Sequence, residues 1–570
     1  MGSSAIKRRL PLATAIVGLA AAVFILRVGG FGAGWLPSPG TLCALYAVLA
    51  LSAQIPDDVR SDRLVTFART HGFAIGVALV VALGIAVRLP HLNAELGHAP
   101  IDIDEHRLAE NVHHFFSTGE LVHTTVEHYP GLVFWLFSGA SFIGYMRILS
   151  GGRAIPVALL PVERFVAWAR IANLGVAAGI ICLTALIGKR VFNSWTGVAA
   201  AALVAVAPLS TATTLVVRND PGMVLAVLAA VYCAIESLEN DRLPWIAGGG
   251  AAAGIAVGIK YSSVFVIITI IAAALCKGTS ARRILRTFVG CVAFAVAVAV
   301  TNHFIWSDVP NFLRQLSDQI AITGAGHWAA TADPAGMYVR TLAGRDGVGV
   351  GLLIAGVAFA VYSLTVPTAR SLVFLTFPIL YMWFMTHRPS QFARWVFPLL
   401  PFAAIAGMGV LIALVKLQVP EGMVTSVRQK TALSRAAAVL VAIAMLWQPL
   451  VGAVADVSRR AGTPTQTLAE RWLAQHVQQG QVVLTEYGWL DLGGLPTPAR
   501  RVPDLRALLD GGVAACRGAT WVVVPEPDFG HATLASLALV KRFHASSGFG
   551  GNTGFDYEIY RVPGASPPQP

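Results

Sequence analysis

Charged residues are scarce in this sequence. Asp, Glu, Lys and Arg make up 13% of the 570 residues, whereas hydrophobic residues make up 55% and the mean hydropathy is +0.66. A single water-soluble core cannot bury that much apolar surface, because a soluble chain needs a polar exterior. The composition therefore excludes an ordinary soluble protein and predicts a chain that lipid surrounds.

Cysteine is also scarce, with six residues in the whole chain. Five of the six lie in or beside apolar runs, and Cys516 is the only one in the polar C-terminal tail. A disulfide framework and a cysteine-rich metal site both need several cysteines in one segment. The tail must therefore fold without either of these.

Apolar runs recur along most of the chain, and they predict an all-α polytopic membrane protein with about 13 transmembrane helices. Several runs are shorter than the ~20 residues that cross a bilayer upright, so these are half-helices or use flanking residues. The runs are Leu12–Ile25, Leu42–Ala53, Phe73–Val87, Phe165–Ile187, Gly197–Val217, Met223–Ile235, Ile246–Gly258, Val264–Leu275, Phe288–Val300, Val348–Ser363, Leu372–Met385, Val396–Val415 and Ala436–Val451.

Lys and Arg cluster in alternate loops, which places those loops on the cytoplasmic side. An odd number of spans then predicts a multi-pass protein of the bacterial inner membrane, with a cytoplasmic N-terminus and a periplasmic C-terminal domain. The net charge of +12 needs no nucleic-acid partner, because much of it lies beside anionic headgroups. The clusters are Lys7–Arg9, Arg60/Arg63/Arg69, Lys189–Arg190, Lys277/Arg282/Arg283/Arg286 and Lys416/Arg428/Lys430/Arg435.

The polar segments divide the chain into two predicted domains. Residues 1–454 form the membrane domain, with a first outer loop at 89–163 and a second at 302–346, and residues 455–570 form a small extracytoplasmic α/β domain. In the α/β domain the patterns predict helices at Thr467–Gln478 and Leu534–Phe543 and strands at Gln481–Glu486, Thr520–Pro525 and Tyr557–Val562.

The first outer loop holds the densest group of acids. Asp102, Asp104 and Glu105 fall within four residues, directly outside a predicted span. Such carboxylates are costly near lipid unless they stay hydrated or paired, which makes them candidates for function. An alternative interpretation is that Asp104 and Glu105 cap the N-terminus of a surface helix at His106–Phe116, where the helix dipole favours acids.

A series of motifs resembles the GT-C glycosyltransferases of the protein mannosyltransferase and aminoarabinose transferase type. The resemblance runs from Phe73 to the tail, and the ordered set is far more specific than any single motif. Two departures are the helices before Phe73, which are additional, and His128–Gly131, which replaces a Pro-Pro-rich stretch. The motifs are Asp104-Glu105, Leu108–Asn111, Gly119, Tyr129–Gly131, Ala169–Asn173, Lys189–Phe192, Arg218–Pro221, Gly254–Tyr261, Gly326–Tyr338, Ala393–Pro401 and Leu468–Trp472.

The resemblance implies an inverting hexosyl- or pentosyltransferase that moves a sugar from a polyprenyl-phosphate donor to an extracytoplasmic glycan, lipid or protein. Asp104 matches the family's loop position and would be the general base. Glu105 and Asp220 would position acceptor or sugar. The lipid phosphate would be held by the cations Lys260, Arg170 and Arg394.

The chemistry of a phosphate leaving group fits this set of residues. Because a phosphate departs as a stabilised anion, one carboxylate to accept the acceptor's proton and cations for the phosphate suffice. Counting spans from a cytoplasmic N-terminus brings all six candidates to outer membrane ends, provided that Leu132–Tyr145 lies along the outer surface.

Each cation and Asp220 also has a structural interpretation. Asp220 can cap a helix that has Pro221 in its first turn, and this is compatible with function. Lys260 can extend from a helix end to the membrane interface. Arg170 and Arg394 can serve as interfacial anchors.

Histidines crowd the first outer loop, and on a helix His106, Glu110 and His113 or His114 share one face. A divalent metal is therefore an alternative, and Asp102 and Asp104 also have a spacing found in metal-binding carboxylates. Histidine is equally suited to an interfacial helix, and the resemblance does not call for a metal. We predict no metal and no cofactor, and His327 has the same two interpretations.

A transporter or flippase of lipid-linked sugars is the alternative function. Its charges would line a path across the membrane, whereas the charged residues noted here gather on the outer side. A sensor with a membrane anchor is a third class, but it explains neither 13 spans nor the ordered motifs.

Overall fold

The computed structural model describes residues 62–89, 92, 103–120, 132–152, 155–302, 333–388, 392–416, 445–456, 463–486, 505–525, 532–544 and 556–563, with short stretches in 306–317 and 490–502. Within the described part, one compact unit comprises Thr66–Leu92 and Asp104–Ala453, and a second includes Val454–Pro570. The predicted spans Leu12–Ile25 and Leu42–Ala53, residue His327 and most of the second outer loop lie outside the described residues.

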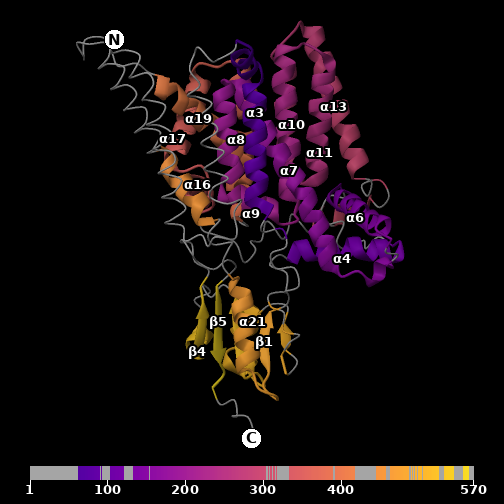
Figure 1. Cartoon of the computed structure of the whole chain (residues 1–570), viewed down its shortest axis with the longest axis vertical. Helices are drawn as coiled ribbons and strands as arrows, with labels where there is room; N and C mark the ends of the chain where they lie inside the picture. The colour runs from indigo at the N-terminus through magenta and orange to yellow at the C-terminus, as the bar shows by residue number, and fades with distance from the viewer. Residues whose placement is uncertain are drawn as a thin grey trace, which may run out of the picture. The chain divides into compact units, whose positions relative to one another are not determined.

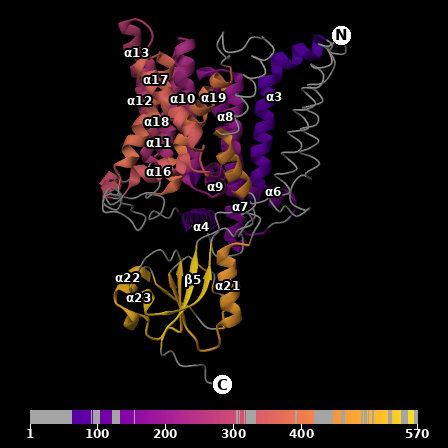
Figure 2. The same ribbon diagram turned by 90° about the vertical axis from the view of Figure 1, so that its left-hand side faces the viewer.

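The first unit is a bundle of helices (Figures 1 and 2). Every predicted span from Phe73–Val87 to Val396–Val415 coincides with helix. The helices are α3 (Asp62–Arg88), α7 (Val162–Val191), α8 (Ser194–Val206), α9 (Pro208–Leu215), α10 (Asn219–Glu239), α11 (Leu243–Ile259), η3 (Tyr261–Phe265), α12 (Val266–Leu275), α13 (Ser280–Thr301), α16 (Pro334–Ala343), α17 (Val350–Thr365), α18 (Ala369–Thr386), η4 (Ala393–Leu399) and α19 (Leu400–Lys416).

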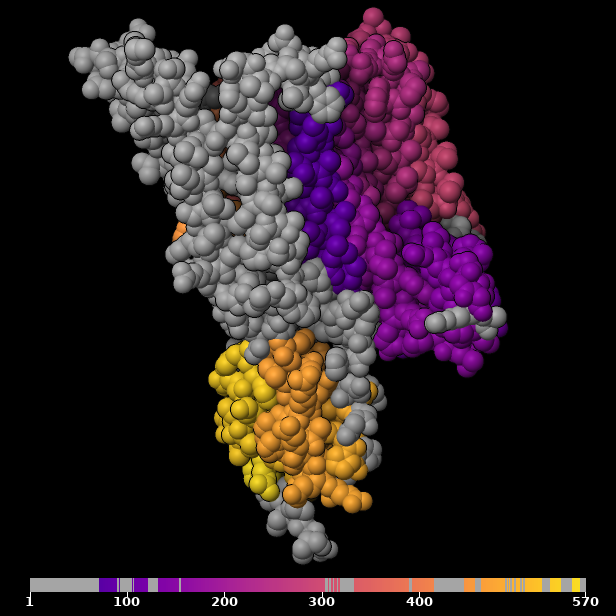
Figure 3. Space-filling model, viewed as in Figure 1, coloured from indigo at the N-terminus to yellow at the C-terminus, as the bar shows by residue number. Residues whose placement is uncertain are grey.

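Many of these helices are long and apolar enough to cross a membrane. Among the described residues, seven helices pass by length and composition, or up to eight if the bent pair α8 and α9 counts as one span. Three shorter apolar helices, at Leu243–Ile259, Tyr261–Leu275 and Val350–Thr365, accompany them. Figure 3 shows α3 as an indigo column along the surface of the bundle. The prediction of a polytopic helical membrane protein is confirmed.

Two further helices, α4 (Ile103–Thr118) and α6 (Leu132–Ser150), lie together at one end of the bundle (Figures 1 and 2). Helix α4 starts earlier than the sequence predicts, so that Asp104 and Glu105 lie in its first turn. Helix α6 packs on α7 where a Cβ at Gly144 would lie 2.4 Å from the ring of Trp168. Its course along the membrane surface stays a prediction.

The predicted span Gly197–Val217 is not one straight helix, because the chain bends by 59° between α8 and α9. Pro208 opens α9 and has no N–H to continue the ladder of α8. The fully buried Arg88 occupies the break and donates to the carbonyl of Ala205 at 2.7 Å and to the hydroxyls of Ser210 at 3.0 Å and Thr214 at 2.7 Å. A sequence pattern of apolar residues does not reveal this bend.

Helices α11 and α13 approach each other closely through a row of glycines. Gly250, Gly254 and Gly258 recur every four residues on one face of α11. A Cβ at Gly250 would lie 2.2 Å from the carbonyl oxygen of Gly290, and one at Gly254 would lie 2.5 Å from that of Phe294. Small residues allow such contact between helices in a membrane, where dispersion replaces the hydrophobic effect. This packing fixes the axis of the helix that ends at Lys260.

The C-terminal domain is built on a five-stranded sheet of order β2-β1-β3-β5-β4. Strands β2 and β3 run parallel to β1, and β5 pairs antiparallel with both β3 and β4. Figure 2 shows α21 on one side of this sheet and α22 and α23 on the other. The elements are α21 (Thr465–His476), β1 (Val483–Glu486), β2 (Arg500–Val502), α22 (Leu505–Asp510), η5 (Val513–Cys516), β3 (Trp521–Pro525), α23 (Ala532–Ala535), β4 (Ala538–Phe543) and β5 (Tyr557–Arg561).

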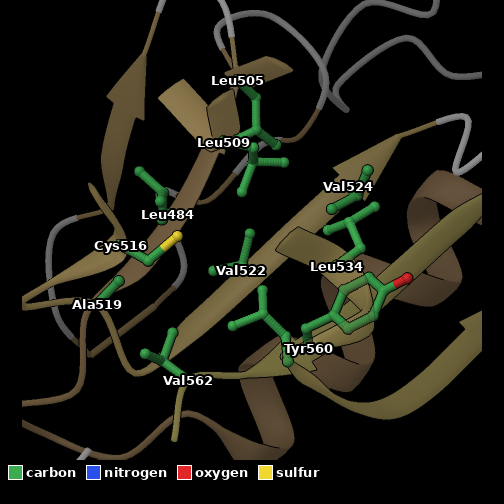
Figure 4. Packing of buried hydrophobic residues seen from close by; sticks show 11 residues of the cluster. Leu484, Leu505, Leu509, Cys516, Ala519, Val522, Val524, Leu534, Tyr560 and Val562 are labelled. Atoms are coloured by element: carbon green, nitrogen blue, oxygen red, sulfur yellow. The ribbon is translucent and has the colours of Figure 1, made fainter. Parts of the chain in front are cut away.

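Alternation along the strands gives this sheet two apolar cores. On one face Leu484 and Val522 pack with Leu505 of α22 (Figure 4). On the other face Val483 and Val523 pack with helix α21. A helix on each face of the sheet therefore has its own buried cluster, which confirms the predicted α/β character of the tail.

The predicted helix at Leu534–Phe543 is wrong in its second half, which forms the edge strand β4. Pairing with β5 satisfies the backbone, and Arg542, opposite Glu558 in the register, makes an ion pair with it. Glu558 also accepts the hydroxyl of Tyr560; burial and this carboxylate raise the pKa of Tyr560 above its usual value. The strand therefore forms through tertiary contacts, which override local helical preference.

The glycine packing predicts opposite effects for one substitution at two sites. Gly254→Ala places a methyl group against the backbone of α13, and overpacking of this kind costs ~1–3 kcal/mol. Gly175→Ala in α7 meets nothing within 4 Å and gains up to ~1 kcal/mol of helix propensity. Thermal unfolding in detergent should therefore occur at lower temperature for Gly254→Ala and not for Gly175→Ala. Equal midpoints for the two variants would contradict the close packing.

The two cores of the tail predict that residues 455–570 fold alone as a water-soluble domain. A fragment of these residues should unfold cooperatively on heating. The variant Val522→Asp, which puts a charge at a fully buried position, should abolish that transition. Circular dichroism and the width of the melting curve provide the measurement, and a fragment without a folded signal would contradict the prediction.

Candidate functional site

Three of the predicted site residues come together at one end of the bundle. Asp220, 1% exposed, lies in the first turn of α10, and Lys260 follows the last residue of α11. The ammonium of Lys260 donates to Oδ1 of Asp220 at 2.6 Å. Arg394 of η4 approaches Oδ2 of the same carboxylate, with its Nε at 3.9 Å. One carboxylate therefore faces two cations that come from different elements.

A third cation, Arg218, and the aromatic ring of Trp395 complete this group. Arg218 lies within electrostatic range of Asp220 and Arg394. The ammonium of Lys260 lies 5.4 Å from the centre of the Trp395 ring, a cation–π distance. We call Asp220, Lys260, Arg394 and Arg218 the acid–cation cluster. Among the described side chains of this cluster, three cations lie around one carboxylate.

The structure pairs the two remaining described candidates with each other. Nε of Arg170 lies 2.8 Å from Oε1 of Glu105, and Nη2 lies 2.6 Å from Oε2. Both side chains are buried, at 7% and 3% exposed. Two parallel hydrogen bonds make this a bidentate ion pair, the geometry that a guanidinium and a carboxylate favour. The roles predicted for these two residues toward substrate stay predictions.

The candidate base is located only through its helix. Asp104 lies in the first turn of α4, next to Glu105, and its side chain lies outside the described residues. The structural interpretation of Asp220 as a helix cap is wrong, because Arg218 is the N-cap residue of α10. Lys260 does not extend toward the interface alone, because it is bonded to Asp220.

The described part of α4 offers few side chains that could bind a metal ion. His113 packs edge-on against Phe165, and its Nε2 lies 3.3 Å from the carbonyl oxygen of Val157. The side chain of His106 lies outside the described residues. Among the residues that the structure describes, no group of three or more His, Cys, Asp or Glu side chains has the arrangement of a metal site.

Buried charge also occurs at the opposite ends of the same helices, which corrects the expectation that it gathers on one side. Glu236, 1% exposed, accepts from Nε of Arg190 at 2.6 Å. Arg286, also 1% exposed, pairs with Asp241 and donates to the carbonyl oxygen of Ser237 at 3.1 Å. We call Arg190, Glu236, Asp241 and Arg286 the far-end group. Each of the two arginines here pairs with an acid, and Arg282 also approaches Asp241, with its Nε 3.9 Å from Oδ2.

Three residues of the site were not among the candidates predicted from the sequence. Arg218 stands two positions before Asp220, so the motif itself held the signal. Asn173 of α7 donates to the carbonyl oxygen of Val216 at 2.9 Å, and Tyr381 of α18 donates to that of Trp395 at 2.9 Å. Each of these two bonds joins residues that are not neighbours in the chain, so no local sequence pattern predicts the bond.

Fold and site together define a polytopic helical membrane protein with a cluster of cations at one end of its helices. The sequence model of the dolichyl-phosphate-mannose-protein mannosyltransferase family matches residues 164–306, which include α7 to α13 and the residues from Arg170 to Lys260. No curated protein matches the chain. The predicted resemblance is thereby confirmed for this part of the sequence.

Solved structures extend the similarity to the fold of most of the chain. The oligosaccharyltransferase of Archaeoglobus fulgidus superposes with a TM-score of 0.52 at 11% identity, over 80% of this chain and 70% of that one. The same enzyme, named AglB, in complex with an inhibitory peptide and a dolichol-phosphate gives 0.52 at 10% identity over the same shares. ArnT of Cupriavidus metallidurans bound to undecaprenyl phosphate gives 0.41 at 15% identity, over 88% of this chain and 100% of that one.

Proposed function

We propose that this protein transfers a sugar from a polyprenyl-phosphate donor to an acceptor on the non-cytoplasmic side of the membrane. The observation that carries the proposal is the acid–cation cluster, which brings three cations around one carboxylate at one end of a helix bundle. The family match over the same helices and the dolichol-phosphate named for the archaeal enzyme of the same fold support a lipid phosphate as the ligand.

The charge of the cluster suits the leaving group better than the donor. A polyprenyl-phosphate sugar is a phosphodiester with one negative charge, and the released polyprenyl phosphate approaches two. Negative charge on the phosphate therefore grows as the glycosidic bond breaks. A cluster of several cations stabilises the late, more negative species more than the donor, which is the requirement for lowering the barrier.

Each residue of the cluster has a role in this scheme. Lys260 and Arg394 bind the phosphate oxygens. Asp220 orients both cations, since one of its oxygens faces each of them, and this revises the sequence-based role of positioning acceptor or sugar. Asp104 takes the proton of the attacking hydroxyl from the first turn of α4, and direct displacement by that hydroxyl inverts the anomeric carbon.

The orientation of the protein follows from its two charged ends. The end that carries the far-end group holds four cations: Lys189, Arg190, Lys277 and Arg282. Lys189 and Arg190 lie in the last turn of α7, Lys277 donates to a carbonyl in the last turn of α10, and Arg282 approaches Asp241. Cation-rich ends stay in the cytoplasm during insertion. The acid–cation cluster then faces the other side, the periplasm of a bacterial inner membrane, where polyprenyl-linked sugars meet their acceptors.

A transporter of lipid-linked sugars is the second candidate, because buried charge occurs at both ends of the helices. In the far-end group Arg190 and Arg286 each pair with an acid, and Arg286 also donates to the carbonyl oxygens of Ser237 and Ala273. Such contacts stabilise helix ends. The purified protein should transfer isotopically labelled sugar to an acceptor, and translocation in liposomes without transfer would favour transport instead.

The lipid phosphate predicts a specific loss of binding. Lys260→Ala removes a charged hydrogen-bond donor and should weaken binding of polyprenyl phosphate ~10-fold to 100-fold. Arg283→Ala, which removes one positive charge from an exposed position of α13, is the matched control and should bind normally. Isothermal titration in detergent measures both. Equal affinity in wild type and Lys260→Ala would remove Lys260 from the site.

The candidate base predicts a loss of rate without a loss of binding. Asp104→Asn keeps size but cannot accept a proton, so kcat should fall ~100-fold to 10,000-fold while donor affinity stays unchanged. The control is Glu120→Gln, because Glu120 is exposed and lies two residues after the end of α4. The scheme uses no metal, so the wild-type rate should survive EDTA. Full activity of Asp104→Asn, or a deficit wholly in donor binding, would place the base elsewhere.

A further inference from the structure

The segment that joins α9 to α10 is extended, so its backbone groups need partners from outside the helices. Val216 has φ −91° and ψ 142°, and Arg218 has φ −143° and ψ 170°. An unpaired backbone group is costly in a buried segment next to lipid. The segment leads directly into Arg218 and Asp220, so its partners determine where the acid–cation cluster stands.

Two side chains from other elements supply these partners. Oε1 of Glu105, on α4, accepts the N–H of Val217 at 2.9 Å. Nδ2 of Asn173, on α7, donates to the carbonyl oxygen of Val216 at 2.9 Å. Both polar atoms of the single peptide group between Val216 and Val217 are thus held, from two directions, by side chains that are 3% and 2% exposed.

Arg170 fixes the carboxylate that holds the segment. Its guanidinium binds both oxygens of Glu105, and its Nη1 donates to the carbonyl oxygen of Leu92 at 3.2 Å. Arg170 and Asn173 lie three residues apart on α7, so they present their side chains from the same face of the helix. We call Glu105, Arg170 and Asn173 the clamp.

We infer that the clamp positions the phosphate-binding cations, acting through Val216 and Val217, and that Glu105 and Arg170 bind neither sugar nor phosphate directly. Glu105 follows Asp104 in the same turn of α4, so one carboxylate also ties the candidate base to the segment that carries Arg218 and Asp220. The clamp therefore sets the distance between the base and the leaving group. This inference rests on the proposed function.

The kind of charge at Arg170 separates the clamp from direct phosphate binding. A lysine keeps the positive charge but lacks the planar fork that holds both oxygens of a carboxylate. If Arg170 bound phosphate as a charge, Arg170→Lys would retain most of the affinity that Arg170→Gln loses. If it acts in the clamp, both variants should weaken binding of polyprenyl phosphate by roughly tenfold, since misplacement by about 1 Å is enough to impair a site.

Asn173→Ala tests the clamp without any change of charge. It removes the partner of one carbonyl group, and it should weaken polyprenyl-phosphate binding about tenfold and lower kcat at saturating donor. Arg164→Gln, which removes a charge from an exposed position of the same helix, should leave both quantities unchanged. Melting temperatures of all variants show whether each protein is folded, and Asn173→Ala decides the question if Arg170→Lys does not fold.

Three results would overturn the inference. The first is wild-type binding and transfer by Asn173→Ala, and the second is wild-type binding by Arg170→Lys together with a loss in Arg170→Gln. Either result leaves the proposed function intact and contradicts the clamp alone. The third is a wild-type protein that does not bind polyprenyl phosphate, which contradicts the proposed function and the clamp together.

Discussion

A charged side chain that leaves water must find an opposite charge or a set of oriented dipoles, and this constraint fixes the end of the bundle that carries the candidate site. The bond from Lys260 to Asp220 joins the residue that follows the end of α11 to the first turn of α10. Arg394 adds η4 to the same carboxylate. Three elements distant in sequence therefore meet because none of their charges is stable near lipid without the others.

The course of the helices could largely be predicted, because an apolar run next to lipid has few other solutions than a helix. The break at Ala207 could not be predicted from hydropathy, although Pro208 is a local signal for it. What makes the break stable is Arg88, whose guanidinium binds a carbonyl and two hydroxyls around the bend. That contact joins α3 to α8 and α9, and only the folded chain brings them together.

The sequence could bring the candidate residues to one end of the bundle, but it could not show which side chains pair with each other. The family resemblance singled out Glu105, Arg170, Asp220 and Lys260 as candidates, and counting spans brings all four to one side of the membrane. The sequence did not indicate that Arg170 binds Glu105 rather than a ligand, since the two lie 65 positions apart. The edge strand β4 was missed for the same reason, because its stability comes from pairing with β5.

The two charged ends of the bundle differ in a way that bears on function. In the far-end group Arg190 pairs with Glu236 and Arg286 with Asp241, and the neighbouring Lys277 and Arg286 itself bind carbonyl groups near helix ends. In the acid–cation cluster, by contrast, three cations lie around one carboxylate. A carrier that moves a phosphate across the bilayer needs comparable affinity on both sides, because the ligand must leave where it arrives. A transferase instead retains the phosphate at one end while the sugar departs, and the grouping of three cations around Asp220 suits that role.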